Sequence, residues 1–334
     1  MKHKRVIIWG YKLYSHTHSY IHAGYYQAFK NLGYDVYWLD SNDNFDPQLF
    51  NDALIFTEQW AVMNNPNMPL FNNSTYAVHY LGNKENQVEG NPGPSIYFGR
   101  VGRLIDVRCN VDKWIDKNYD YSLDRSKVEK IGSGSYYEKG SDYDIFYTLW
   151  ATDLFPEQIN FDDMYIPKEN YVFFAGTIGG GRGGPKDCSP APPEYDNLIY
   201  LNPFIQACEE LGIEFRYNCP WISPQTFEEQ KVIIQKSYLA PDFRHRAFKE
   251  RGYIPCRTFK NISYGQLGIT NSKSVYEFFD GNITYNEDTY QLFFDAEKQR
   301  ENYDMIRSQM LFVKENHTYI NRVNELIEIV NGGL

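Results

Sequence analysis

The stretch IIWGYKLYSHTHSYIHAGYYQAFKNLGYDVYWLD, residues 7–40, decides how the chain begins to fold. Its first residues are apolar and β-prone, as in a buried strand, and a polar loop follows. The next segment has helical spacing, with one apolar face made of Tyr25, Ala28, Phe29 and Leu32. Gly33 is placed to end that helix, and YDVYWLD reads as the next strand. Strand, helix and strand form a βαβ unit, which predicts a parallel sheet with a right-handed crossover.

The same pattern starts again in the second half of the chain. ENYVFFAGT, residues 169–177, is a buried strand that runs into glycines, and NPFIQACEELGIEFRYN repeats helix, glycine and strand. With 334 residues the chain is long enough for two domains. We therefore predict an α/β protein with two Rossmann-like, doubly wound domains facing a cleft. Ligands should lie outside the carboxyl ends of the strands, between the halves.

The expected domain boundaries follow from these two starts. Residues 1–165 form the N-terminal domain and residues 166–315 the C-terminal domain, while residues 316–334 form a helix that returns to the N-terminal domain. Residues 83–139 read as irregular and aromatic, and GSGSYYEKGS within them reads as a loop.

Composition excludes several classes of function. The formal charge of −10 makes the chain a poor match for a phosphate backbone or an anionic bilayer. The five cysteines are odd in number and contain no C-x-x-C pair, so we expect a reducing compartment and no disulfide framework or zinc cluster. No apolar run reaches the roughly 18 residues of a membrane span. The prediction is a cytoplasmic protein without an integral membrane segment.

A glycine-rich turn, FFAGTIGGGRGGPKD, follows the first strand of the second half. Glycines there let backbone N–H groups approach an anion closely, and a cation adds charge. The turn is neither a Walker loop nor a dinucleotide fingerprint, because the following residues fit neither pattern. Its candidate binding residues are Gly176, Thr177, Gly179 and Arg182. The alternative is a flexible surface loop.

A second candidate is GYIPCRTFKNISYGQLGITNS, residues 252–272. Arg257 and Lys260 are three residues apart in the first turn of a predicted helix, where the helix dipole also attracts anions. Asn271 and Ser272 follow at the tip of a short strand, where they can donate hydrogen bonds. The alternative is a surface helix with ordinary solvated cations.

Three histidines, His16, His18 and His22, lie in the polar loop after the first strand. At neutral pH a histidine suits the role of general base. Metal binding is the rival interpretation, because H-x-H chelates zinc, but no third and fourth ligand is evident nearby in the sequence. A loop that lines a binding site without proton transfer is a further alternative.

Two other groups remain open at this point. Asp153 in LWATDLFP is either a base or the cap of a following helix. Arg100 and Arg103 in GRVGR either bind an anionic ligand or pair with acids such as Asp106.

Pro255, Arg257, Phe259 and Gly265, followed by a small polar strand end, resemble the donor-binding element of GT-B glycosyltransferases. The pattern is closest to the spore-coat-type, family-1-like group. ENHTYINRVNELIEIV resembles the closing helix of that group, and FFAGT the opening of its C-terminal domain. In this chain Lys260 and Gly268 replace the two glutamates of the E-x7-E pattern of many retaining members, which favours inversion.

The resemblance implies a metal-independent transferase that needs no cofactor. It would move a sugar from a nucleoside diphosphate sugar, UDP or GDP undetermined, to a hydroxyl of a glycan or glycoconjugate. The implied donor set is Gly176, Thr177, Gly179, Arg182, Arg257, Lys260, Tyr264, Asn271 and Ser272. The resemblance also implies that His16 or His18 is the general base for the acceptor hydroxyl. The implied acceptor residues are Ser19, His22, Arg100 and Arg103. The alternatives are a non-catalytic, two-lobed sugar- or nucleotide-binding protein and a transferase acting on modified DNA, which the negative charge disfavours. No nucleic-acid partner is expected.

Overall fold

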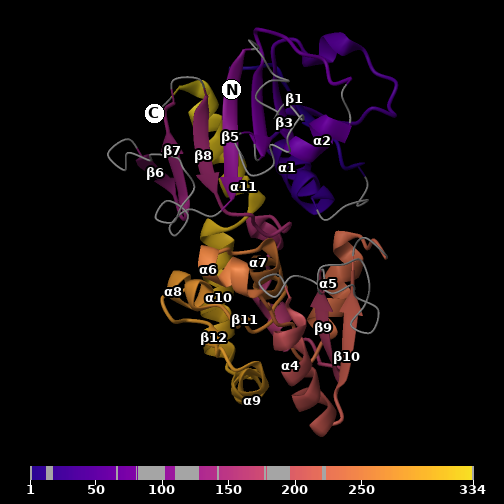
Figure 1. The fold of residues 1–334 in the computed structure, drawn as a ribbon, viewed down its shortest axis with the longest axis vertical. Helices are drawn as coiled ribbons and strands as arrows, with labels where there is room; N and C mark the ends of the chain where they lie inside the picture. The colour runs from indigo at the N-terminus through magenta and orange to yellow at the C-terminus, as the bar shows by residue number, and fades with distance from the viewer. Residues whose placement is uncertain are drawn as a thin grey trace. The chain divides into compact units, whose positions relative to one another are not determined.

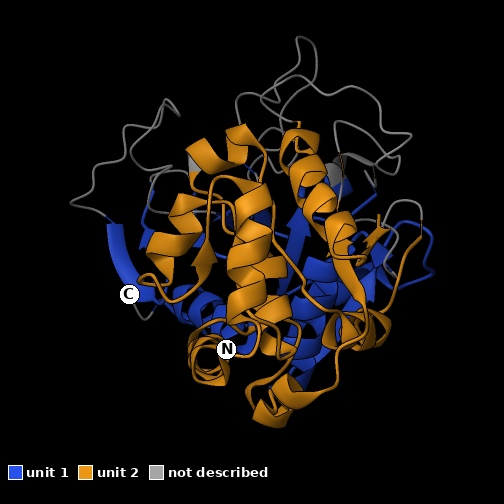
Figure 2. Cartoon of the chain, turned by 90° about the horizontal axis from the view of Figure 1, so that it is seen from below, with its two compact units in different colours: residues 1–149, 319–334 blue, residues 150–318 orange. Residues whose placement is uncertain are grey.

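The computed structural model describes residues 2–12, 18–64, 67–79, 81, 102–109, 128–140, 143–176, 178, 196–219 and 223–332. The chain divides into two compact units, which Figure 2 colours separately. Unit 1 comprises Met1–Leu149 and Tyr319–Leu334, and unit 2 comprises Trp150–Thr318. The boundaries expected from the sequence were 165/166 and 315/316. Residues 150–165 belong to unit 2 because Thr152 pairs with Thr318, and the Thr152 N–H donates to His317 O at 3.0 Å.

Unit 1 is built on one sheet whose order is β2-β1-β3-β4-β5-β8-β7-β6 (Figure 1). Its strands are β1 Arg5–Trp9, β2 Asp35–Leu39, β3 Ala53–Glu58, β4 Thr75–His79, β5 Arg103–Cys109, β6 Val128–Gly132, β7 Ser135–Glu138 and β8 Asp144–Thr148. Its helices are α1 Ser19–Asn31, the 3-10 helix η2 Pro47–Phe50, α2 Gln59–Asn64 and α11 Tyr319–Asn331. The pairs from β2 to β8 are all parallel, as the βαβ pattern predicted.

The central strands of unit 1 are buried on both faces, as in parallel sheets covered by helices. On one face Tyr25 of α1 stacks on Phe56 of β3, with ring centroids 3.9 Å apart. The opposite face carries Ile7, Trp9 and Ile55 in a separate apolar cluster. Helix α11 packs on α1, since a side chain at Gly24 would collide with the ring of Tyr319. The helix that closes the chain is therefore part of unit 1.

The expectation of an irregular region over residues 83–139 is wrong for three segments. Strand β5 is buried in the middle of the sheet, and β6 and β7 form an antiparallel hairpin. The turn of that hairpin contains Gly134 at φ +75°. Its second strand, β7, lies within GSGSYYEKGS, which was predicted to be a loop. A two-residue Ser-Gly connection between short strands is a hairpin signal, but the flanking glycines and charges masked it.

Unit 2 has a second parallel sheet with the same winding. Parallel pairs join β10 to β9 and β11 to β12, and the segment 239–242 bridges them through Val172 to Leu239 and Asp242 to Thr270. The spatial order is β10, β9, segment 239–242, β11, β12. Its strands are β9 Tyr171–Ala175, β10 Glu214–Asn218, β11 Ile269–Thr270 and β12 Thr284–Tyr285.

Helices surround this second sheet. They are η5 Pro156–Gln158, η6 Phe161–Tyr165, α4 Leu198–Glu210, α5 Phe227–Lys236, α6 Arg246–Arg251, α7 Cys256–Ser263, α8 Lys273–Phe278, α9 Thr289–Gln299 and α10 Tyr303–Asn316. An aromatic core joins α4, α9 and the sheet, because Phe204 meets Phe293 at 5.2 Å and Phe243 at 4.9 Å. Among the described residues, no helix combines the length and the apolar character needed to cross a bilayer.

When strands are numbered by their order in the chain, the first five strands of unit 1 lie side by side in the order 2-1-3-4-5. The five segments of the unit 2 sheet follow the same order. The expected α/β class and the doubly wound, mostly parallel sheets are thus confirmed. This order has a switch point between the first and third strands, where ligands bind in such folds. We therefore expect the candidate site of each unit at its switch point.

Candidate functional site

At the switch point of unit 1, three side chains from separate segments meet. His18 is the N-cap of α1, after β1, while Glu58 ends β3 and His79 ends β4. Because β3 and β4 are parallel and in register, Glu58 and His79 are direct partners. Each side chain thus comes from the carboxyl end of a strand or the connection that follows it. We call these three residues the His-Glu-His cluster.

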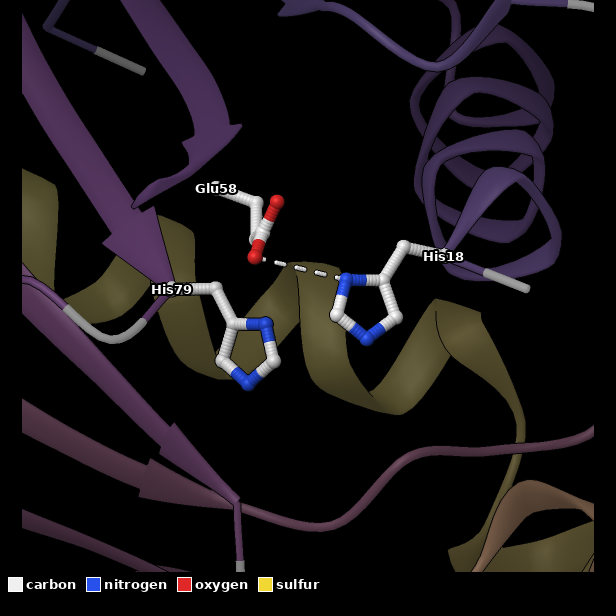
Figure 3. Close-up of side chains that lie close together, drawn as sticks. All are labelled: His18, Glu58 and His79. Atoms are coloured by element: carbon white, nitrogen blue, oxygen red, sulfur yellow. Dashed lines mark ion pairs between the residues drawn. The ribbon is translucent and has the colours of Figure 1, made fainter. Parts of the chain in front are cut away.

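The cluster is compact. One ligand atom from each residue lies within 4.8 Å of the other two. His18 Nδ1 is 3.5 Å from Glu58 Oε1, and the ring centroids of His18 and His79 are 5.5 Å apart. Figure 3 shows both imidazole rings on the same side of the Glu58 carboxylate. The other carboxylate oxygen, Oε2, accepts a hydrogen bond from Ala61 N at 3.2 Å, which fixes its direction.

Burial and neighbouring charges set the protonation of this cluster. Burial alone would raise the pKa of Glu58, but the hydrogen bond and charge of His18 outweigh it and hold that pKa below its usual value. Burial drives the pKa of His79 well below its usual value, and His18 and His22 lower it further. At neutral pH Glu58 is therefore an anion and His79 a neutral imidazole.

Tyr11 is a ring neighbour of both His18 and His22. Burial lowers the pKa of His22 to about 4, and its Nδ1 lies 2.8 Å from Gly10 O, so the neutral ring donates there. Tyr11 has φ +52°, a left-handed conformation that is strained for tyrosine, and its ring meets His18 at 5.8 Å and His22 at 5.5 Å. Burial raises the pKa of Tyr11, as do the charge of Glu58 and the hydrogen bond to it.

The other residues predicted for unit 1 are placed as follows. His16 and Arg100 lie outside the described residues. Ser19 is fully buried in the first turn of α1. Arg103 begins β5, so it lies at the edge of the sheet opposite to the carboxyl ends. Its Nε donates to Asp144 Oδ2 at 2.7 Å and its Nη1 to Ile329 O at 2.7 Å, which supports ion pairing, with Asp144 in place of Asp106, over acceptor binding.

At the switch point of unit 2, Gly176 and Arg257 are in contact. Gly176 follows β9, and a Cβ added there would collide with the guanidinium of Arg257. Arg257 comes from the first turn of α7, and its guanidinium carbon lies 4.3 Å from the centre of the Phe174 ring. The glycine bend and the first cation of the predicted anion site are therefore adjacent.

One carboxylate organises two arginines at this point. Asp242, which ends the segment 239–242, pairs with Arg244 and lies 3.4 Å from Arg257 Nη1, and Thr258 Oγ1 donates to it at 3.2 Å. Burial and the charge of Arg244 lower the pKa of Arg257 to about 10, so it keeps its proton at neutral pH. Two guanidiniums and one carboxylate leave one net positive charge. Neither Arg244 nor Asp242 was among the site residues predicted from the sequence.

Lys260 has different partners. Its Nζ donates to Gln230 Oε1 at 2.8 Å and lies 4.8 Å from the centre of the Phe227 ring. Asp153 accepts a hydrogen bond from Tyr264 at 2.5 Å, and the N-cap of the following η5 is Phe155, so Asp153 is not that cap. Burial raises the pKa of Asp153, although the charge of Lys260 opposes this. Unit 2 thus has two further polar pairs, Lys260 with Gln230 and Asp153 with Tyr264.

The strand-end residues of β11 are buried. Asn271 accepts from Arg244 N at 2.8 Å and donates to Arg244 O at 3.1 Å, so it fixes the backbone that presents Arg244. Ser272 N donates to Thr270 Oγ1 at 3.1 Å, and the Ser272 side chain is fully buried. Thr177, Gly179 and Arg182 lie outside the described residues.

A hollow of about 380 Å³ in unit 2 lies elsewhere. Its lining includes Lys168 and Asn170, which precede β9, and Gln266, which precedes β11. It therefore opens at the amino ends of these strands, away from Gly176 and Arg257. We place the candidate site at the carboxyl ends, because the charged groups converge there.

Comparison with known proteins gave little. No family model matches the chain, and no curated protein matches it. Solved structures similar to the chain include a UDP-forming α,α-trehalose-phosphate synthase from Burkholderia xenovorans, in complex with glucose-6-phosphate. The alignment covers 94% of this chain and 79% of the synthase, with 8% sequence identity and a TM-score of 0.45. The fold class rests on the strand order within each unit and not on this likeness.

Proposed function

We propose that this chain is a glycosyltransferase of GT-B type that moves a sugar from a nucleoside diphosphate sugar to a hydroxyl of a glycan or glycoconjugate. The observation that carries the proposal is the contact between Gly176 and Arg257, with Asp242 and Arg244 beside it, at the switch point of unit 2. Guanidiniums bind phosphate and carboxylate oxygens through paired hydrogen bonds, and a diphosphate offers several such oxygens to two converging guanidiniums. The spore-coat-type motifs around Arg257 favour the same assignment.

In this proposal unit 2 binds the donor. Arg257 and Arg244 face the diphosphate, while Asp242 holds both guanidiniums so that little side-chain entropy is lost on binding. As the sugar leaves, negative charge grows on the diphosphate, and the fixed cations stabilise that charge. Lys260 Nζ is hydrogen-bonded to Gln230 and Tyr264 to Asp153, so these two predicted donor residues take a less direct part in binding the diphosphate.

Unit 1 is proposed to bind the acceptor. Its switch point carries the His-Glu-His cluster, which contains the groups suited to taking a proton from a hydroxyl at neutral pH. Inversion of the anomeric centre remains the favoured outcome on the sequence pattern. The proposal does not include metal independence. In the folded chain Glu58 and His79, which are distant from His18 in the sequence, lie beside it and could serve as the further metal ligands.

The test is nucleotide binding by the full chain. UDP, GDP, CDP and TDP and their sugars are titrated by calorimetry and by thermal shift, since a ligand of the folded state alone raises the melting temperature. We expect one nucleotide to bind, and Arg257→Met to weaken binding about tenfold or more through the loss of a charged hydrogen bond. Arg216→Met is the matched control, because Arg216 is an exposed arginine of the same unit that pairs with Glu214.

Two results would contradict the proposal. If none of the four nucleotides binds at millimolar concentration, the donor site does not exist. If the nucleotide sugar binds but is neither transferred to any glycan nor hydrolysed, the chain is a binding protein and not an enzyme.

A further inference from the structure

We infer that His18, Glu58 and His79 form a binding site for one divalent transition-metal ion in unit 1, with Zn²⁺ as its simplest probe. The inference concerns unit 1 alone and does not rest on the proposed sugar transfer. The three side chains supply two imidazole nitrogens and one carboxylate oxygen. Two histidines and one glutamate are the protein ligands of one common class of zinc site, which keeps a fourth position open.

The spacing of the ligand atoms fits one ion. Two ligands bound to a tetrahedral zinc ion lie about 3.4 Å apart, given bond lengths of about 2.1 Å. His18 Nδ1 and Glu58 Oε1 are 3.5 Å apart, and all three ligand atoms lie within 4.8 Å of one another. The His18 side chain is 25% exposed, so its ring has room to turn toward an ion.

The backbone presets two of the three ligands. Glu58 and His79 end neighbouring strands as register partners, which fixes the separation of their Cα atoms. Ala61 N donates a hydrogen bond to Glu58 Oε2. The other carboxylate oxygen, Oε1, faces His18. Such outer contacts orient ligands in known metal sites and are part of their affinity.

Charge gives an independent reason. Glu58 is 1% exposed, and within the described part of the chain no lysine or arginine pairs with it. Taking a carboxylate out of water is costly, and the His18 ring at 3.5 Å compensates its charge only when that ring is protonated. A divalent ion held by all three side chains would compensate the charge of Glu58 directly.

An ion would also change the use of His18. A nitrogen bonded to a metal accepts no proton, so His18 would be a ligand and no longer a base. The open fourth position would then hold water or the hydroxyl of an acceptor, whose pKa the ion lowers. Deprotonation of an acceptor in unit 1 remains feasible by this route.

The experiment measures metal binding by the full chain after dialysis against a chelator. Zn²⁺ and Co²⁺ are titrated separately by calorimetry, and the Co²⁺ complex is also followed by its visible absorption spectrum. We expect one ion per chain with a micromolar or tighter Kd, and a Co²⁺ spectrum typical of mixed nitrogen and oxygen ligands. Absence of binding by both ions up to millimolar concentration would overturn the inference.

The variants assign the ligands. His18→Gln and Glu58→Gln should each weaken binding by more than about tenfold, because each removes one of three ligands. His18→Gln is the main variant, since its partly exposed side chain can be replaced with little risk to folding, and circular dichroism checks each protein. The control is His245→Asn in unit 2. His245 Nδ1 accepts from Phe248 N and so caps α6, and the asparagine Oδ1 can accept the same hydrogen bond without an imidazole. Equal affinity for all three variants and the wild type would place the ion elsewhere and refute the site.

Failure of this inference and failure of the proposed function can be told apart. Arg257→Met alters unit 2 alone and should bind Zn²⁺ as the wild type does, while Glu58→Gln should bind the nucleotide as the wild type does. Loss of metal binding in Arg257→Met would contradict a site confined to unit 1.

Discussion

Glu58 and His79 are register partners at the last positions of β3 and β4, and both side chains are almost fully buried. A pair of this kind is set by the backbone, because parallel strands in fixed register bring their final residues together whatever loops follow. His18 joins the pair from the N-cap of α1, whose position depends on the crossover from β1. The cluster is thus a product of topology as much as of residue choice.

This pairing predicts the behaviour of an exchange variant. Glu58→His combined with His79→Glu puts the same two ligand types at the same edge of the sheet. We expect Zn²⁺ binding to be retained, weaker than in the wild type by about tenfold to a hundredfold, because the hydrogen bond from Ala61 N to the carboxylate is lost. Calorimetry compares it with Glu58→Gln. An exchange variant no better than the single variant would show that the register does not position the ligands.

Gly176 gives a prediction for unit 2. It has φ +157° and no room for a side chain beside Arg257. Gly176→Ala should therefore cost about 1–3 kcal/mol of stability and displace the guanidinium, with weaker nucleotide binding as the result. Gly212→Ala is the control, because Gly212 has φ +65° but open space around it. It should lose stability and keep the affinity for nucleotide. Equal affinity in the two variants would remove Arg257 from the donor site.

Much of the fold follows from local sequence. Helix α1 is buried through Tyr25, Ala28 and Phe29, three of the four residues on the face that the spacing predicts. The fourth, Leu32, is the exposed C-cap, and Gly33 beyond it has φ +81°. The segment from Cys256 forms α7, ends before Gly265 and leads into β11, also as expected. Such elements are readable because their apolar period and their stop signals agree. The β6–β7 hairpin was missed because its strands have only five and four residues and β6 has no buried position, so the apolar pattern is too short to read.

The candidate sites were readable only in part. His18, Gly176 and Arg257 sit in local patterns that suggest their chemistry. Glu58 and His79 do not, since each is one polar residue at the end of an apolar strand, and only sheet register joins them. Asp242 likewise acquires meaning only when a parallel bridge to Thr270 brings it beside α7. Long-range pairing is the information that a single sequence does not display.

A buried ion pair in α11 contributes to the stability of unit 1, and the contribution can be measured. Arg322 is fully buried, its Nε donates to Leu149 O at 2.8 Å, and its Nη1 lies 3.2 Å from Glu325 Oε1. Arg322→Met should destabilise unit 1 by about 3–5 kcal/mol, because Glu325 is left as an uncompensated buried charge. Adding Glu325→Leu should restore most of the loss. Urea unfolding of the three variants forms the cycle, and additive losses would contradict coupling between the two residues.

Lys168 provides a pH dependence whose sign is fixed by burial. Burial lowers its pKa from 10.5 to about 8, against the opposing charge of Asp163, while its Nζ donates to Gln235 O at 2.7 Å. Between about pH 8 and pH 10.5 the unfolded chain holds a proton that the folded chain has released. Stability therefore rises with pH across that window. Wild type should gain stability relative to Lys168→Met from pH 8 to pH 10.5, as measured by urea unfolding at fixed ionic strength.

The matched control for this prediction is Lys236→Met. The Lys236 side chain is 50% exposed and its Nζ lies 3.4 Å from Glu169, so the group stays in contact with water in the folded chain. Its removal should shift stability by a similar small amount at every pH in the window, as is usual for exposed ion pairs. A pH-independent difference between wild type and Lys168→Met would mean that the Lys168 ammonium remains solvated, and the burial argument would then fail.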